Sequence, residues 1–163
     1  MKLLNTLLIA GAALTTTLIA TGCSSSSSSV SPFQTLPVEC MGVAYDGSQT
    51  LRVQGKGRNA SEAIEQAHKN AVHAVIFKGI TAGGGDCDAR PLVTEANGEE
   101  KYEAYFQSFF AKDGEYTKYV SEEPVKKHST IKQKTKTFVV RVITVKVQRA
   151  QLKAKLKADG IIG

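Results

Sequence analysis

Three cysteines carry the clearest chemistry in this sequence of 163 residues. Cys23 follows a positive start at Lys2, an apolar run over residues 3–20 and the small residues that end at Gly22. That order is typical of a secretory signal cleaved after small residues. We therefore predict a signal peptide over residues 1–22.

The residues around Cys23 resemble the lipobox of bacterial lipoproteins, although the usual Leu three positions before the cysteine is Ala20 here. The resemblance implies a lipid joined to Cys23 through a thioether bond; an ordinary signal peptide followed by a chance cysteine is the alternative. Six serines follow, Ser24–Ser29, and a tract of this composition forms a flexible coil. Residues 23–37 are therefore predicted to be a Ser-rich tether. A serine directly after the cysteine resembles lipoproteins sorted to the outer membrane. The expected location is the periplasmic face of that membrane, with acyl chains such as palmitate as the anchor.

Cys40 and Cys87 remain as an even pair, and the predicted compartment is oxidising. A disulfide is the expected state of such a pair, and it would close a loop of about 48 residues. A Cys/His nucleophile that uses His68, His73 or His128 is the alternative, but no local motif supports it.

The charge is divided unevenly along the chain. Residues 23–124 contain nine Lys and Arg against fourteen Asp and Glu, whereas residues 125–163 contain eleven Lys and Arg against one acid, Asp159. One account is a solvated basic face that needs no partner. The other is an electropositive surface for phosphate head groups or an acidic envelope protein. The candidate residues of that surface, which share a face only if the turn between the strands does not flip them, are Lys132, Lys134, Lys136, Lys146, Lys153 and Lys157.

Residues 38–163 are long enough for one domain with one core. Strands are predicted over residues 38–45, 50–53, 125–133 and 137–148, and helices over 60–78, 99–111 and 149–158. The order of these elements predicts an α+β fold, in which an antiparallel sheet of about four strands in two hairpins is covered by a long amphipathic helix, with further helices.

The long helix is expected to bury a face of small and aliphatic residues that includes Ala67 and Ala71, with His68 at its boundary. Its polar face is expected to consist of Glu62, Glu65, Gln66, Lys69 and His73. Gly55 and Gly57, just before this helix, predict a close approach of two backbones. The alternative is a phosphate-binding turn, but the other residues of a P-loop are missing. The aromatic stripe Tyr102–Phe110 of the second helix reads as core, with a ligand-stacking surface as the alternative.

Two segments resemble a known family. Val53-Gln54-Gly55-Lys56-Gly57, followed by the Ala-rich helix, is similar to the LPP-twenty lipoproteins and to the amino-terminal domain of flagellar assembly T-proteins. Residues 140–147 and the helix after them resemble the closing segment of related envelope lipoproteins. The resemblance implies a small α+β domain with a long helix on a curved antiparallel sheet, a structural or assembly role at the envelope, and no catalytic residues.

The expected function is therefore a lipid-anchored, non-enzymatic envelope protein that binds, scaffolds or assembles, without a metal or cofactor. No nucleic acid is expected as a partner, because the aromatic interleaving of a single-strand binding surface is absent; self-association is left open. The alternative is a periplasmic small-ligand carrier or enzyme built around the Tyr102–Phe110 stripe and His68. A pocket lined by those aromatic side chains would favour the alternative.

Overall fold

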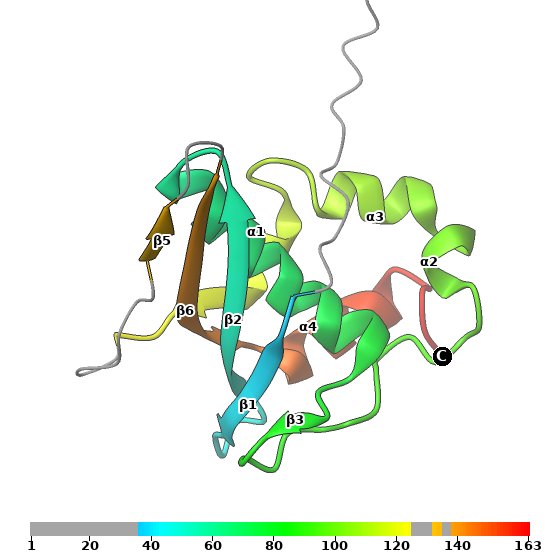
Figure 1. Cartoon of the computed structure of the whole chain (residues 1–163). Helices are drawn as coiled ribbons and strands as arrows, with labels where there is room; N and C mark the ends of the chain where they lie inside the picture. The colour runs from blue at the N-terminus through cyan, green and yellow to red at the C-terminus, as the bar shows by residue number, and fades with distance from the viewer. Residues whose placement is uncertain (1–35, 125–131, 135–137) are drawn as a thin grey trace, which may run out of the picture.

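The computed structural model of the protein describes residues 36–124, 132–134 and 138–163. Its strands are β1 (Val38–Val43), β2 (Gln49–Gly57), β3 (Ala82–Gly83), β4 (Val120–Glu122), β5 (Lys132–Lys134) and β6 (Val139–Val147). Its helices are α1 (Ala60–His73), α2 (Gly98–Lys101), α3 (Glu103–Phe109) and α4 (Arg149–Ala158), with a π-helical turn η1 (Ala74–Lys78) and a 3-10 turn η2 (Glu115–Tyr119). The predicted α+β class is confirmed (Figure 1).

The sheet has the strand order β3-β1-β2-β6-β4, and β5 pairs with the same edge of β6 as β4. The first predicted hairpin is confirmed, because β1 pairs with β2 antiparallel. β5 pairs with β6 antiparallel, but residues 125–131 of the predicted strand 125–133 lie outside the described residues. β6 is a central strand, as its apolar residues on both faces predicted. The parallel pairing of β3 with β1 and the short strand β4 were not predicted. Both are too short to have a sequence pattern of their own.

The long helix lies directly against the sheet, because two glycines of β2 remove the side chains that would separate the backbones. A Cβ atom built on Gly55 would lie 2.6 Å from the backbone nitrogen of Ala67, and one on Gly57 would lie 2.6 Å from that of Ala63. Ala63, Ala67 and Ala71 are fully buried on the facing side of α1. The close-approach interpretation of the two glycines is therefore confirmed.

The first turn of α1 is closed by its own side chains. Asn59 accepts a hydrogen bond from the backbone nitrogen of Glu62 at 2.9 Å, and the Glu62 carboxylate accepts one from the backbone nitrogen of Arg58 at 2.9 Å. This is a variant of the capping box, in which a side chain returns to a donor just ahead of the helix. A phosphate at this helix start would meet the Glu62 carboxylate, so the phosphate-binding interpretation finds no support.

A second layer of side chains covers the face of α1 that points away from the sheet. Phe106, Phe109, Phe110 and Tyr116 are all at most 5 % exposed, and they form one continuous core with the sheet side. The expected polar face is not open to solvent at Gln66, Lys69 and His73, which are all buried. Lys69 lies beside Tyr116 of η2, and the His73 ring lies beside Phe77 and Phe110. Figure 1 shows α4 on the far side of α1 from the strands. The predicted amphipathic helix is thus a central helix between two layers.

The buried polar side chains of α1 have partners within the fold. Gln66 donates to the Asn70 side chain, and Asn70 donates to the carbonyl of Gln54 on β2 at 3.1 Å. The ammonium of Lys69 lies 2.9 Å from the Glu65 carboxylate and 5.6 Å from the centre of the Tyr116 ring. Because these three side chains are paired, their burial does not carry the penalty of an unsatisfied donor or acceptor. The Nε2 atom of His68, on the same helix, is buried without a hydrogen-bond partner.

The helix predicted over residues 99–111 is divided into α2 and α3. Tyr102 leaves helical geometry at φ −109° and ψ 26°, and α3 ends at Phe109. The break turns the aromatic stripe toward η1: Phe106 meets the Phe77 ring edge-on, with 4.7 Å between ring centres. The last predicted helix, 149–158, is confirmed as α4, with Leu152 and Leu156 fully buried.

The glycine contact gives a direct stability test. Gly55→Ala should lower the free energy of unfolding by about 3 kcal/mol, because the added methyl group overpacks a backbone contact that neither element can relax. Urea unfolding measures this change. Gly84→Ala is the matched control, since no atom lies within 4 Å of its added Cβ and its φ is not in the left-handed region. Equal stabilities of the two variants would contradict the close-approach account.

Candidate functional site: the end of the central helix

Cys40 and Cys87 form the predicted disulfide, with 5.8 Å between their Cα atoms. The bond joins β1 to the segment 80–97, which crosses the molecule between η1 and α2. Gly85 packs against the same bridge, because a Cβ there would lie 2.7 Å from the Cys40 sulfur. The disulfide therefore holds this long connection against the edge of the sheet, close to the end of the central helix.

The central helix ends in a π-helical turn. Gly79 donates its backbone nitrogen to the carbonyl of Ala74, five residues earlier, at 2.8 Å. Two carbonyls of this widened turn accept hydrogen bonds from the segment 80–97. The Val75 carbonyl accepts from the backbone nitrogen of Leu92 at 3.1 Å, and the Ile76 carbonyl accepts from that of Val93 at 2.8 Å. Single π-helical turns occur frequently at functional sites. Here the turn also docks the segment that the disulfide holds.

Arg149, at the start of α4, fastens the same segment from the other side. Its guanidinium lies 2.8 Å from the Asp88 carboxylate and donates to the carbonyl of Arg90 at 2.8 Å. The pKa of Asp88 is lowered, first by the hydrogen bond from the backbone of Arg90 and then by the charge of Arg149. A cation at a helix start opposes the helix dipole, so this position indicates a specific partner elsewhere.

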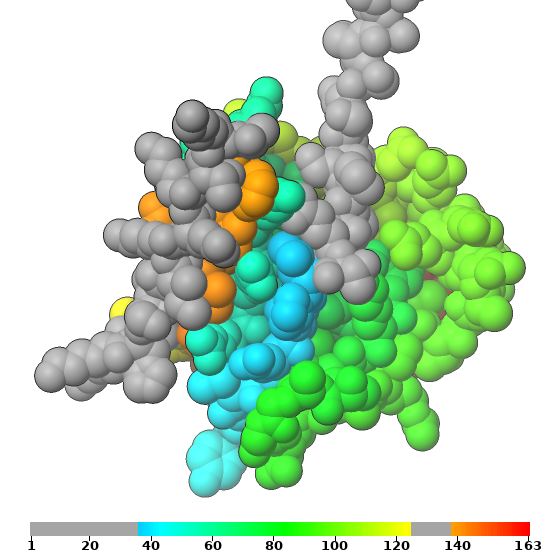
Figure 2. Space-filling model, in the orientation of Figure 1, coloured from blue at the N-terminus to red at the C-terminus, as the bar shows by residue number. Residues whose placement is uncertain are grey.

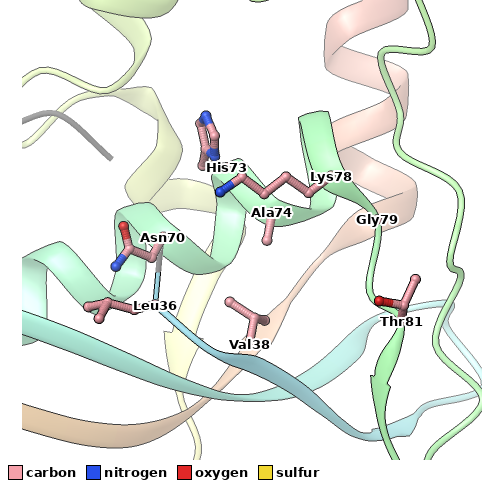
Figure 3. A pocket seen from close by; sticks show the side chains of 8 residues that line it. All are labelled: Leu36, Val38, Asn70, His73, Ala74, Lys78, Gly79 and Thr81. Carbon is pink, nitrogen blue, oxygen red and sulfur yellow. The ribbon is translucent and has the colours of Figure 1, made fainter. Parts of the chain in front are cut away.

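A pocket opens between the end of α1, η1 and the edge of β1 (Figure 3). Its volume is about 220 Å³. Three apolar and four polar side chains line it together with a glycine: Leu36, Val38, Ala74, Asn70, His73, Lys78, Thr81 and Gly79. No carboxylate belongs to this lining. In Figure 3 the Lys78 side chain runs along the helix toward His73, while Val38 and Leu36 rise from the start of β1 below it.

His73 is the most constrained polar group of the pocket. It is 4 % exposed, its Nε2 atom lies 3.0 Å from the Glu99 carboxylate, and its ring packs against Phe77 with 5.0 Å between ring centres. Burial lowers the pKa of His73, the hydrogen bond to the Glu99 carboxylate opposes this, and the nearby charge of Lys78 lowers the pKa further. His73 is therefore neutral at neutral pH and ties the end of α1 to α2.

A wider hollow lies on the other side of the His73–Glu99 contact. Its volume is about 520 Å³, and its lining is Phe77, Val93, Glu95, Asn97, Gly98, Glu99, Glu100 and Glu103. Two of these acids are already paired: Glu99 with His73, and Glu95 with Lys101 at 2.7 Å. Among the described residues no group of three or more metal-ligating side chains is present. The smaller pocket is thus lined without a carboxylate, whereas four Glu side chains line the wider hollow.

The structure does not assemble the ligand site expected around the aromatic stripe and His68. The aromatic side chains of the stripe pack into the core with Phe77 and His73, and none of them lines either pocket. Only their acidic neighbours Glu99, Glu100 and Glu103 line the wider hollow. His68 instead faces β4, with its Nε2 atom 3.7 Å from the Glu122 carboxylate. Burial lowers the pKa of His68 as well, and the carboxylate of Glu122 opposes that shift.

The candidate basic residues do not form one face. The register opposes Lys132 to Arg141 and Lys134 to Val139, whereas Lys146, an even position of β6, is opposed to Thr50. Because opposed positions of an antiparallel pair share a face, the positions of β5 and Lys146 belong to opposite faces of the sheet, which corrects the expected grouping. Lys153 and Lys157 are exposed on α4. Lys136, His128 and Cys23 lie outside the described residues.

Two residues that shape this region, Asn70 and Lys78, were not singled out from the sequence, and Arg149 was expected only among the basic residues of the last helix. Each had a local signal. Asn70 is a poor helix former on an otherwise apolar face, Lys78 is a cation in the last helical turn, and Arg149 is a cation in a first turn. These signals indicate tertiary partners, but they do not say which ones.

No family model, no curated protein and no solved structure matches this chain. Within the part of the chain that the structure describes, none of the helices combines the length and the apolar character needed to cross a bilayer.

The disulfide should contribute substantially to stability. Replacing both cysteines, Cys40→Ala with Cys87→Ala, should lower the free energy of unfolding by up to about 4 kcal/mol, since the unfolded chain loses a long cross-link. Urea unfolding of the oxidised protein and of this variant measures the difference. Two free thiols on alkylation of the denatured, unreduced protein would contradict the pairing itself.

The buried histidines predict a dependence of stability on pH. The folded-state pKa values of His68 and His73 are lowered, so below a pH of about 6.5 the unfolded chain binds more protons than the folded one. The free energy of unfolding should therefore fall between about pH 7.5 and about pH 5.5, before most carboxylates titrate. His73→Gln, which cannot titrate, should reduce this slope. An unchanged slope would mean that His73 titrates normally in the folded protein.

Proposed function

We propose that this protein is a lipid-anchored envelope protein of the outer membrane, held by Cys23 at its periplasmic face, whose single α+β domain has a binding or scaffolding role and no catalytic one. The observation that carries the proposal is the sequence around Cys23: a charged start, an apolar run, small residues and a cysteine, followed directly by a serine tract.

The disulfide supports the compartment from an independent direction. Disulfides form and persist in oxidising environments, and they are rare where thiols are kept reduced. Cys40 and Cys87 lie within bonding distance although 47 positions separate them in the sequence. A secreted destination explains why the two remaining cysteines of the chain should pair in this way.

The described side chains support binding over catalysis. An active site needs groups with perturbed protonation placed beside a reacting position. The strongest candidate, His73, is held between Glu99 and the Phe77 ring at the edge of a small pocket, so its ring nitrogen Nε2 is already engaged by a carboxylate of the fold. The aromatic stripe that the ligand-carrier alternative requires is packed as core. That alternative therefore has no specific observation in its favour.

The described basic residues are spread over several parts of the surface and do not form one electropositive patch. The Lys146 ammonium lies 3.9 Å from the Asp46 carboxylate. Lys153 and Lys157 are exposed and lie one helical turn apart on α4. Contact with anionic head groups or an acidic envelope protein through such dispersed charges would be weak and sensitive to salt. The resemblance to the LPP-twenty lipoproteins stays a prediction, with no matching family model beside it.

The proposal is tested at Cys23. In a bacterial host that processes lipoproteins, the mature protein should begin at Cys23 and carry acyl groups on it, as measured by mass spectrometry of the amino-terminal peptide. Cys23→Ala should release the protein from membranes or stall its processing, whereas Cys40→Ala should leave the anchoring unchanged. A mature protein with an unmodified Cys23 would contradict the proposal.

A further inference from the structure

The exposed large hydrophobic side chains among the described residues all come from one short stretch. Met41 is 52 % exposed, Val43 46 % and Tyr45 fully exposed, at the end of β1 and in the turn that leads to β2. Single exposed apolar residues are ordinary, but a group of them confined to one end of a molecule marks a contact surface. Figure 2 shows this hairpin tip, in pale cyan, projecting at the lower edge of the molecule.

The fold does not need these side chains. The turn is closed by polar contacts: Asp46 accepts hydrogen bonds from the backbone and hydroxyl of Ser48, and Ala44 donates to the carbonyl of Ser48 at 2.9 Å. The core side of the hairpin is supplied by Cys40 and Leu51. Apolar residues at Met41, Val43 and Tyr45 therefore contribute nothing to the core, and exposing them to water is unfavourable.

The tether limits what can cover the tip. The described chain begins at Leu36, beside the start of β1, and thirteen positions separate it from Cys23. Fully extended, such a segment spans about 45 Å, and the stretch from Leu36 to Tyr45 about 30 Å. A domain anchored at Cys23 thus stays near the bilayer at all times, and its hairpin tip can reach that surface without strain in the tether.

The groups at the tip match an interfacial contact. Tyr45 combines an apolar ring with a hydroxyl, which is the type of side chain enriched where hydrocarbon meets head groups. The ammonium of Lys146 lies 3.9 Å from the Asp46 carboxylate, next to Tyr45, and would meet lipid phosphates once the tip is seated. The disulfide holds the base of the same hairpin, so the apolar side chains are presented on a rigid support.

We infer that the β1–β2 hairpin tip, through Met41, Val43 and Tyr45, seats in the surface of the bilayer to which the protein is anchored. This is a second membrane contact besides the lipid, and it rests on the proposed lipid anchor at Cys23. It orients the domain, because the tether alone allows any orientation. The contact itself is weak, and it forms readily only because the anchor keeps the tip at a high local concentration near the membrane.

The absence of tryptophan from the chain makes the test specific. Tyr45→Trp places one fluorescent reporter at the tip, and Tyr102→Trp places the matched reporter at the α2–α3 junction, on another part of the molecule. Each acylated mature protein is reconstituted into vesicles of phosphatidylethanolamine and phosphatidylglycerol with brominated acyl chains. We expect the emission of the Tyr45→Trp protein to shift to the blue and to be quenched by bromine, and that of the Tyr102→Trp protein to be unaffected.

A second measurement separates the tip from the anchor. The mature chain carrying Cys23→Ala should bind the same vesicles weakly and reversibly. Met41→Ser with Tyr45→Ser should lower its partition coefficient at least about tenfold, as the loss of two buried apolar side chains implies. Lys112→Ser, at an exposed site on another part of the molecule, is the control.

The outcomes distinguish the two proposals. Vesicles that carry the acylated protein while the Trp at position 45 stays in water and unquenched would overturn the tip contact and leave the anchor intact. An unmodified Cys23 would contradict the anchor, and the Cys23→Ala measurement would still decide the tip. A reporter that becomes buried only when envelope proteins are added would assign the tip to a protein partner and overturn the inference.

Discussion

The contact between α1 and β2 is the constraint on which the rest of this fold depends. Gly55 and Gly57 bring the strand backbone against the helix backbone at Ala63 and Ala67, so no side chain separates the two elements. Close contact of this kind gains dispersion energy only where both surfaces are small and rigid. It also fixes the position of the helix over β2 and β6, because sliding by one residue would place a methyl group or a larger side chain where only a glycine fits.

The position of α1 determines what happens at its far end and on its far face. The helix is held so close to the sheet that its opposite face becomes the floor of a second layer, filled by Phe106, Phe109, Phe110 and Tyr116. Buried between two layers, it can carry polar residues only where each finds a partner, as Gln66, Lys69 and His73 do. Its π-helical end, the disulfide-held segment 80–97 and Arg149 then close the structure around a small pocket and a wider acidic hollow.

The sequence predicted the elements well where a pattern repeats within one element. The long helix, the central strand β6, α4, the first hairpin and the disulfide all follow from spacing, turn residues or cysteine count. The predictions from the sequence were wrong where the state of one element depends on another element. The polar face of α1 reads as solvent-exposed until the aromatic segment is known to cover it, and no periodicity reveals the break at Tyr102 or the register that separates Lys146 from the positions of β5. The pocket residues Asn70 and Lys78 come from α1 and from the π-helical turn after it, and a pocket beside them depends on β1, which no pattern within the helix reveals.

The helix–strand contact predicts that α1, between its two layers, is the last part of the described molecule to open. Native-state hydrogen exchange measured residue by residue tests this most directly, because it reports the free energy of opening at each backbone amide. Amides of Ala67 and Ala71 in α1, and of Leu51 and Val145 beside them in the sheet, should exchange only through global unfolding, with those of α3 exchanging through smaller openings. Amides of α1 that exchange faster than those of α3, while the sheet stays protected, would contradict the central role of the helix–strand contact.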